Sequence, residues 1–178
     1  MQLKTDIEHI VVEIIPTRKT QQSLCLANLY SPPLEQLHQY DHFVHELRQM
    51  VNSNEQVLFG DFNAPHVAWG YQCTIKKRAR LHDAARQHGL MLMNDLLDPT
   101  RVSNSVSRDT NPDLMFARDV QNATWTRLPD TLGSDHHIIH IEVEQAHHSF
   151  KTGKARLTYW TANKNYLDGG STTQDIEA

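Results

Sequence analysis

Short apolar runs that alternate with turns and with two helical stretches limit the folds open to this chain more than any other feature of its sequence. Residues 7–15 and 23–30 are rich in β-branched and aliphatic side chains, which favour strands, and the polar turn between them predicts a hairpin. Residues 56–59 form a short apolar run that is followed by Gly60, and they have the profile of a central strand that is buried on both faces. Further strands are expected at 90–93, 113–117, 123–128 and 138–143.

Two segments between these runs have the three- and four-residue spacing of amphipathic helices. In residues 34–51 the apolar face consists of Leu37, Tyr40, Val44, Leu47 and Val51. A second helix is expected over 78–88, and Gly89 follows it where a left-handed cap belongs. Strands that alternate with helices in this way predict an α/β or α+β class with strands of mixed direction.

The length and composition are those of one globular domain. The chain has 178 residues, of which 39% are hydrophobic and 21% are charged, and this is enough for a sizeable core. No apolar run reaches the roughly 20 residues that span a bilayer. Asp6, Glu8 and Glu13 interrupt the N-terminal apolar stretch, which therefore does not resemble a secretory signal. We expect a domain over 1–146 and a polar, flexible tail over 147–178.

Charge and cysteine content narrow the possible functions. Lys and Arg number 17 and Asp and Glu number 21, which gives a formal net charge of −4. Proteins that hold nucleic acid by charge alone are usually basic, so a phosphate substrate would require a divalent metal to supply positive charge. The two cysteines, Cys25 and Cys73, favour a reducing compartment, and we expect an intracellular protein, nuclear or cytoplasmic.

Three polar clusters stand at the ends of predicted strands, where loops on a rigid sheet often carry catalytic groups. They are GDFN at 60–63, NPD at 111–113 and GSDHH at 133–137. Turns or caps would explain the first two, and a buried or orienting histidine would explain the third. Together they supply three carboxylates, an asparagine and a histidine, which are the groups that metal-assisted phosphodiester cleavage requires. Oxygen ligands of this kind favour Mg²⁺ or Mn²⁺.

Four motifs in this order resemble those of the endonuclease/exonuclease/phosphatase superfamily, namely LYSPP (29–33), GDFNAPH (60–66), PDLMF (112–116) and GSDHH (133–137). The loop around Trp69 and the stretch 104–116 are most similar to the endonuclease domain of non-LTR retrotransposons. The resemblance covers about residues 7–145. It implies a DNase-I-like α/β sandwich, in which two mixed sheets are flanked by helices.

The resemblance also implies roles for individual residues. Tyr30 would contact the scissile phosphate through its hydroxyl, whereas a Tyr considered alone would be a packing aromatic at a strand end. Asp61 would position or activate the attacking water and would also bind metal. Asn63 would hold water or a phosphoryl oxygen. Asp113 would orient the imidazole of His136, which is the remaining catalytic group.

Asp135 would be a metal ligand together with Asp61, and the implied cofactor is Mg²⁺, with Mn²⁺ as the alternative. The implied substrate is DNA, cut by nicking one strand, and the implied partner is a reverse transcriptase domain in the full-length polyprotein. An Asn motif and a metal-binding Glu of the family have no counterpart in this sequence. We therefore expect the C-terminal portion of such a domain, incomplete at its N-terminus, with weak or absent cleavage.

Two alternatives and two packing expectations remain open at this point. The chain could be another phosphatase or phosphodiesterase of the superfamily, or a non-catalytic remnant that binds nucleic acid or protein. An incomplete pair of sheets would leave apolar sheet surface uncovered. Trp69 and Tyr71 either border a substrate groove or pin their loop to the body of the domain, and we favour pinning.

Overall fold

The computed structural model divides the chain into two compact units, Met1–Gln145 and Ala146–Ala178. The residues that the structure describes all belong to the first unit. They are 3–17, 22–32, 40–51, 53–72, 79–103 and 108–144. The predicted tail over 147–178 lies outside the described residues, as does the part of the first predicted helix before residue 40. Within the described segments, no helix is long and apolar enough to cross a membrane.

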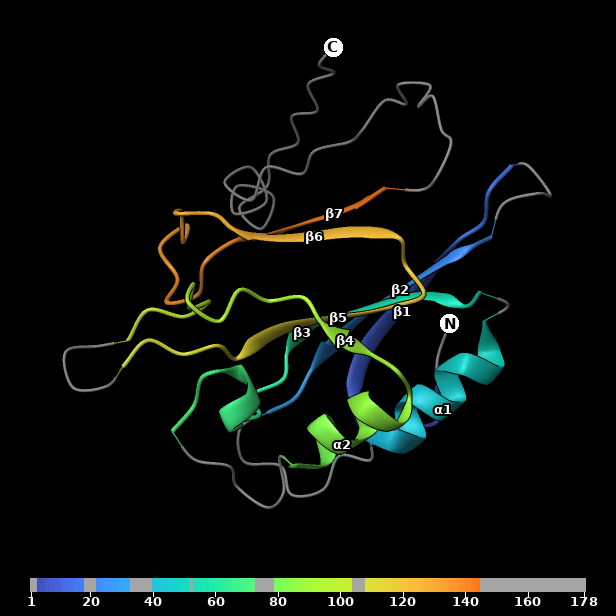
Figure 1. Cartoon of the computed structure of the whole chain (residues 1–178), viewed down its shortest axis with the longest axis horizontal. Coiled ribbons are helices and arrows are strands. Elements are labelled where there is room, and N and C mark those ends of the chain that lie inside the picture. The colour runs from blue at the N-terminus through green and yellow to red at the C-terminus, as the bar shows by residue number, and fades with distance from the viewer. Residues whose placement is uncertain are drawn as a thin grey trace, which may run out of the picture. The chain divides into compact units, whose positions relative to one another are not determined.

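A five-stranded mixed sheet forms the centre of this unit (Figure 1). In spatial order its strands are β1 (Glu8–Ile14), β2 (Leu24–Tyr30), β3 (Glu55–Asp61), β5 (Asp113–Arg118) and β4 (Met91–Leu92). The antiparallel pair β1–β2 is the predicted hairpin, and it is confirmed. β2 and β3 are parallel, while β3–β5 and β4–β5 are antiparallel. The parallel step needs a crossover connection, and the chain between β2 and β3 contains the first helix.

Two helices, α1 (Tyr40–Met50) and α2 (Ala79–Gln87), cover one face of this sheet (Figure 1). Their apolar stripes point at the strands, so that Phe43 and Leu47 of α1 are fully buried in one cluster with Cys25 of β2. Burial of each large apolar side chain contributes roughly 1.5–3 kcal/mol relative to its exposure. The helices therefore hold the central strands in place from this side.

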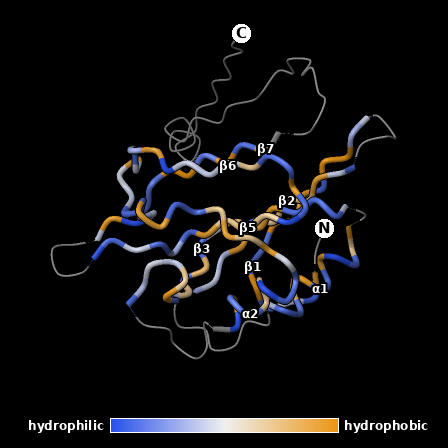
Figure 2. Tube along the Cα trace, viewed as in Figure 1, coloured by the Kyte–Doolittle hydropathy of each residue, from blue (hydrophilic) through white to orange (hydrophobic). Residues whose placement is uncertain are grey.

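A separate antiparallel hairpin, β6 (Asn122–Arg127) and β7 (Ile139–Glu144), packs on the opposite face. Its inward side chains Trp125 and Ile141 contact the cluster that contains Met115 of β5. In Figure 2 apolar residues gather along the central strands, between the hairpin and the helices. The expected α/β architecture, with a mixed sheet, a second sheet and flanking helices, is confirmed. Among the described residues the second sheet consists of these two antiparallel strands.

The edge strand β1 leaves apolar side chains uncovered on this second face. Ile10, Val12 and Ile14 alternate along β1 and are 66%, 51% and 43% exposed. Val12 stands in register with Leu26 of β2, which packs toward the hairpin cluster, so the exposed side chains continue the same face. The expectation of uncovered apolar sheet surface is therefore confirmed.

Trp69 pins the loop that leaves β3, as predicted. It belongs to a short 3-10 helix, Val67–Trp69, and its buried indole Nε1 donates a hydrogen bond to the carbonyl of Ala64. The imidazole of His66 caps this short helix by accepting a backbone N–H through Nδ1. Burial lowers the pKa of His66, and the stacked ring of His82 lowers it further, so the ring stays neutral and keeps its acceptor nitrogen.

Replacement of Gly60 by Ala is predicted to destabilise the central sheet by about 3 kcal/mol or more. Gly60 has φ 138°, and a Cβ there would overlap the carbonyl oxygen of Leu29 and lie 2.8 Å from Oδ1 of Asn28. Gly89 is the matched control, because its φ is 69° and a Cβ would meet nothing within 4 Å. Gly89→Ala should cost only about 1 kcal/mol of backbone strain. Equal losses of the two variants in urea unfolding would contradict the prediction.

Candidate functional site

The register of the central sheet aligns three of the predicted site residues in one row. Tyr30 of β2 is paired with Asp61 of β3, which is paired in turn with Asp113 of β5. Directly paired residues present their side chains on the same face, about 5 Å apart. The next row on that face contains Phe59 and Met115, which pack toward the β6–β7 hairpin. The three site residues therefore lie on the hairpin side of the sheet, away from the helices.

The segment before β7 brings His136 to this row. The backbone of His136 is bridged to Arg101, and the neighbouring His137 donates its N–H to the carbonyl of Thr100 at 2.8 Å. Nδ1 of His136 then lies 2.8 Å from Oδ2 of Asp113. A carboxylate at Nδ1 accepts the proton on that nitrogen, so Asp113 sets both the orientation and the tautomer of the imidazole.

Asp61, Asp113 and His136 form a compact group, which we call the three-residue cluster. Each offers one ligand atom, and these atoms all lie within 4.8 Å of one another. Burial raises the pKa of Asp61, and the nearby carboxylate of Asp113 raises it further. Two crowded carboxylates are relieved by a cation, and carboxylate oxygens are preferred ligands of Mg²⁺ and Mn²⁺. The cluster therefore fits a divalent metal ion.

Asn63 and Tyr30 flank the three-residue cluster. Asn63 has φ 43°, a left-handed conformation that Asn adopts more readily than most residues, and the turn directs its backbone N–H to Oδ1 of Asp61 at 3.1 Å. Its side chain also hydrogen-bonds this carboxylate, and both bonds lower the pKa of Asp61 against the effect of burial. Tyr30 is 44% exposed at the end of β2, so its side chain is open to a ligand that approaches the row.

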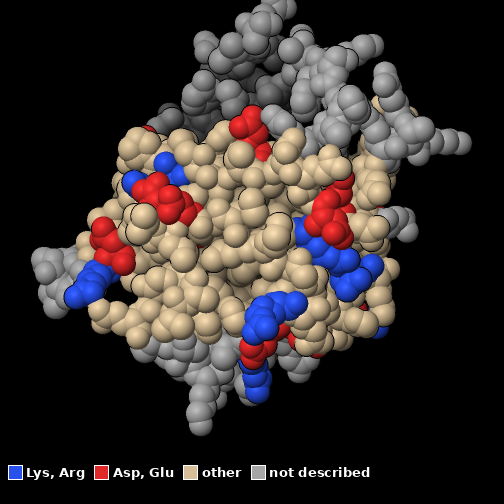
Figure 3. Space-filling model, in the orientation of Figure 1, with Lys and Arg blue, Asp and Glu red and all other residues tan. Residues whose placement is uncertain are grey.

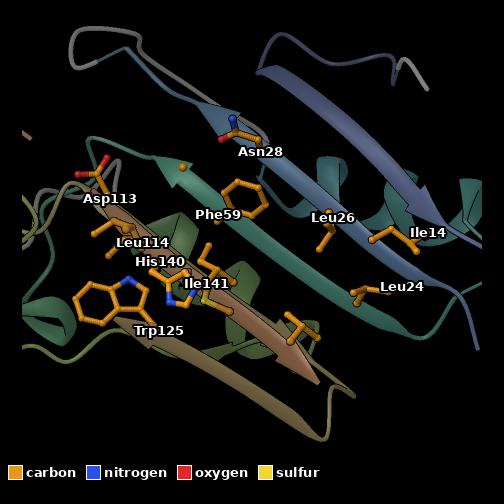
Figure 4. A pocket seen from close by; sticks show the side chains of 14 residues that line it. Ile14, Leu24, Leu26, Asn28, Phe59, Asp113, Leu114, Trp125, His140 and Ile141 are labelled. Atoms are coloured by element: carbon orange, nitrogen blue, oxygen red, sulfur yellow. The ribbon is translucent and has the colours of Figure 1, made fainter. Parts of the chain in front are cut away.

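A groove of about 710 Å³ runs between the central sheet and the hairpin, and Asp113 stands at one end of it (Figure 4). The groove has mainly apolar walls, which include Leu24, Leu26, Phe59, Trp125 and Ile141. Asn28 is a polar residue of the wall. It lies two residues before Tyr30 and is paired with Phe59 in the row next to the site. The largely apolar groove thus meets the three-residue cluster at Asp113.

Asp135 lies beside the three-residue cluster and is not part of it. Its Oδ1 is 4.0 Å from Nε2 of His136, whereas its Oδ2 accepts a hydrogen bond of 2.7 Å from Nε of Arg101. This bond from Arg101 is the main reason that the pKa of Asp135 lies below its usual value. Arg101 could not be predicted from the sequence, because a single Arg at the start of a polar loop matches no motif.

A layer of buried polar side chains behind Asp113 was also missed at the level of the sequence. Asn111 accepts the N–H of Thr100 at 3.1 Å through Oδ1 and donates to the carbonyl of Trp69 at 3.4 Å. Thr100 accepts the N–H of Asp113 at 3.2 Å, and Asn94 donates to the carbonyl of Asp113 at 2.8 Å. These bonds fix the backbone that carries the Asp113 carboxylate. From the sequence, Asn111 is predicted only as part of a turn or cap, and no local pattern singles out Thr100 or Asn94.

A protein-family model described as endonuclease-reverse transcriptase matches residues 24–140, which include all six predicted site residues. The chain belongs to this family. It is therefore a member of the endonuclease/exonuclease/phosphatase superfamily of hydrolases, whose enzymes generally use divalent metals. No curated protein matches the sequence at a significant level.

Solved structures with similar folds include the endonuclease domain of TRAS1, a telomere-specific non-LTR retrotransposon. The TM-score is 0.62 at 20% identity, over 78% of this chain and 69% of the TRAS1 chain, and this likeness shows a DNase-I-like fold. The catalytic domain of human Nocturnin matches with a TM-score of 0.48 at 14% identity. This match covers 78% of this chain and 54% of the Nocturnin chain. An endonuclease/exonuclease/phosphatase family protein from Leptotrichia buccalis C-1013-b matches with a TM-score of 0.45 at 15% identity. This match covers 80% of this chain and 62% of the other.

Replacement of Asp61 by Asn is predicted to raise the melting temperature by a few degrees at pH 7 without added metal. The folded-state pKa of Asp61 is raised, so its charged form costs stability; the cost is absent below the ordinary pKa of 3.8 and grows as pH rises through the raised value. The gain of Asp61→Asn should therefore vanish near pH 3.5. Scanning calorimetry at several pH values measures it, and an equal gain at acid and neutral pH would contradict the assignment.

Proposed function

We propose that this protein is a metal-dependent DNA endonuclease of the retrotransposon type, which nicks one strand by hydrolysing a phosphodiester bond. The observation that carries the proposal is the three-residue cluster, in which two carboxylates and an imidazole from β3, β5 and the segment before β7 share one site. Membership of the endonuclease-reverse transcriptase family supports the same reaction. The proposed cofactor is Mg²⁺, with Mn²⁺ as a substitute, and the proposed partner is a reverse transcriptase domain.

Charge supports a metal-dependent reaction. On the face shown in Figure 3, Lys and Arg side chains lie in small separate groups, most of them beside Asp or Glu. A formal net charge of −4 leaves the chain without an excess of positive charge to hold DNA by itself. A bound divalent ion would offset phosphate charge and stabilise the leaving oxygen.

Each residue of the site has a distinct task in this proposal. Asp61 orients the attacking water and takes its proton, and burial raises its pKa, which makes its carboxylate a stronger base. Asp113 holds Nδ1 of His136, so Nε2 is the nitrogen that meets the phosphoryl oxygen. Tyr30 and Asn63 hold the phosphate and the water from either side of Asp61.

Nicking of supercoiled plasmid tests the proposal directly. We expect relaxed circles with Mg²⁺ or Mn²⁺ and none with EDTA, formed slowly in keeping with the weak cleavage expected from the sequence. Asp61→Asn and His136→Asn should each lose at least about 100-fold of this rate, the usual size of a general acid or base contribution. His42→Asn is the matched control, since His42 is exposed on α1, on the side of the sheet opposite the site. Phosphate release from a phosphomonoester without any nicking would instead favour the phosphatase alternative.

A further inference from the structure

A pocket of about 580 Å³ has Asp135 in its lining and includes no residue of the three-residue cluster. Two arginines line it, Arg101 and Arg108. The carboxylate of Asp135 also lines it, and the remaining lining residues are Val102, Ser103, Thr110, Thr131, Gly133 and Ser134, four of which carry hydroxyl groups. Guanidinium groups together with hydroxyl donors suit a phosphate group, because Arg presents paired donors that match two phosphate oxygens.

Arg101 is the residue that joins this pocket to the proposed metal site. Its Nε donates to Oδ2 of Asp135 at 2.7 Å, and the two side chains are 47% and 53% exposed. Ion pairs with this exposure are weak, so the guanidinium can change partners at little cost. The backbone of Arg101 is held by reciprocal hydrogen bonds with Thr110, at 3.0 and 3.1 Å. A change of partner therefore requires only the side chain to move.

We propose that the pocket between Arg101 and Arg108 binds a DNA phosphate next to the scissile one, and that Arg101 exchanges Asp135 for this phosphate. Without DNA, Arg101 occupies the carboxylate of Asp135 and keeps it from a metal ion. With DNA, Arg101 pairs with the phosphate, and Asp135 becomes available to the metal held by the three-residue cluster. Arg101 is thus a positioning residue that makes metal binding and DNA binding mutually dependent.

The distances explain why the exchange matters. Oδ1 of Asp135 is already 4.0 Å from Nε2 of His136, so this carboxylate borders the three-residue cluster. Its backbone is fixed there by a hydrogen bond of 2.8 Å from Val102 to its carbonyl. In this proposal the pairing with Arg101 is what keeps Asp135 from a metal in the cluster. Linkage requires that any ligand which removes Arg101 from Asp135 strengthens metal binding, and that metal binding strengthens the binding of that ligand by the same factor.

Mn²⁺ affinity, measured from the EPR signal of the free ion, tests the first half of this inference without reference to activity. Arg101→Gln should bind Mn²⁺ about two- to fivefold more tightly than the wild type, the range expected for a half-exposed ion pair. Arg101→Lys keeps the charge, and its Mn²⁺ affinity should fall between those of the wild type and Arg101→Gln. In the Asp135→Asn background, Arg101→Gln should have no further effect. Arg48→Gln on α1 is the control and should leave the affinity unchanged.

Fluorescence anisotropy with a short DNA duplex in EDTA tests the second half. Asp135→Asn releases Arg101 and should tighten DNA binding about threefold, and the gain should disappear when Arg101→Gln is added. Arg101→Gln and Arg108→Gln should each reduce the slope of log K against log salt by about 0.9, the loss of one phosphate contact. An unchanged slope in both variants would overturn the phosphate subsite.

This inference rests on the proposed function, and the two can fail separately. A wild-type chain that binds no Mn²⁺ and does not nick plasmid overturns both. A chain that binds Mn²⁺ and nicks plasmid, but whose Mn²⁺ affinity is unchanged or weaker in Arg101→Gln, overturns the exchange of Arg101 and leaves the endonuclease proposal intact. A gain in Mn²⁺ affinity that persists in the Asp135→Asn background also overturns the exchange, because Arg101 would then act through general charge.

Discussion

The pairing of β2, β3 and β5 is the constraint on which the rest of the site depends. Tyr30, Asp61 and Asp113 are far apart in sequence and become neighbours because their strands are in register at one end of the sheet. That register is stabilised by apolar burial on both faces, under the helices on one side and under the β6–β7 hairpin on the other. Gly60 allows the backbones of β2 and β3 to approach closely one residue before Asp61.

Polar contacts then convert this row into a chemical site. His136 reaches Asp113 because its own backbone is bridged to Arg101, and Asp113 is held from behind by Thr100 and Asn94. These bonds are buried or half-buried, where leaving a polar partner unpaired is costly, so the arrangement resists small displacements. The imidazole and the two carboxylates consequently have a defined geometry before any ligand binds.

Charge balance explains why the site fits a cation. Asp61 and Asp113 repel one another within a partly buried cluster, while the nearby Arg101 is directed at Asp135. The guanidinium of Arg101 thus stays on the border of the cluster, and the crowded carboxylates of Asp61 and Asp113 suit a metal ion. A family whose enzymes use divalent metals is consistent with this distribution of charge.

The sequence by itself determined the strands, the two helices and the family, because hydrophobic periodicity and the ordered motifs are local properties that need no coordinates. It also nominated every residue of the three-residue cluster. Only the tertiary structure decided that Asp135 pairs with Arg101, that Thr100, Asn94 and Asn111 support Asp113, and that the second sheet has two antiparallel strands in the described part of the chain. Partners of this kind are set by how distant segments pack, and no local pattern encodes which side chain will face another across that distance.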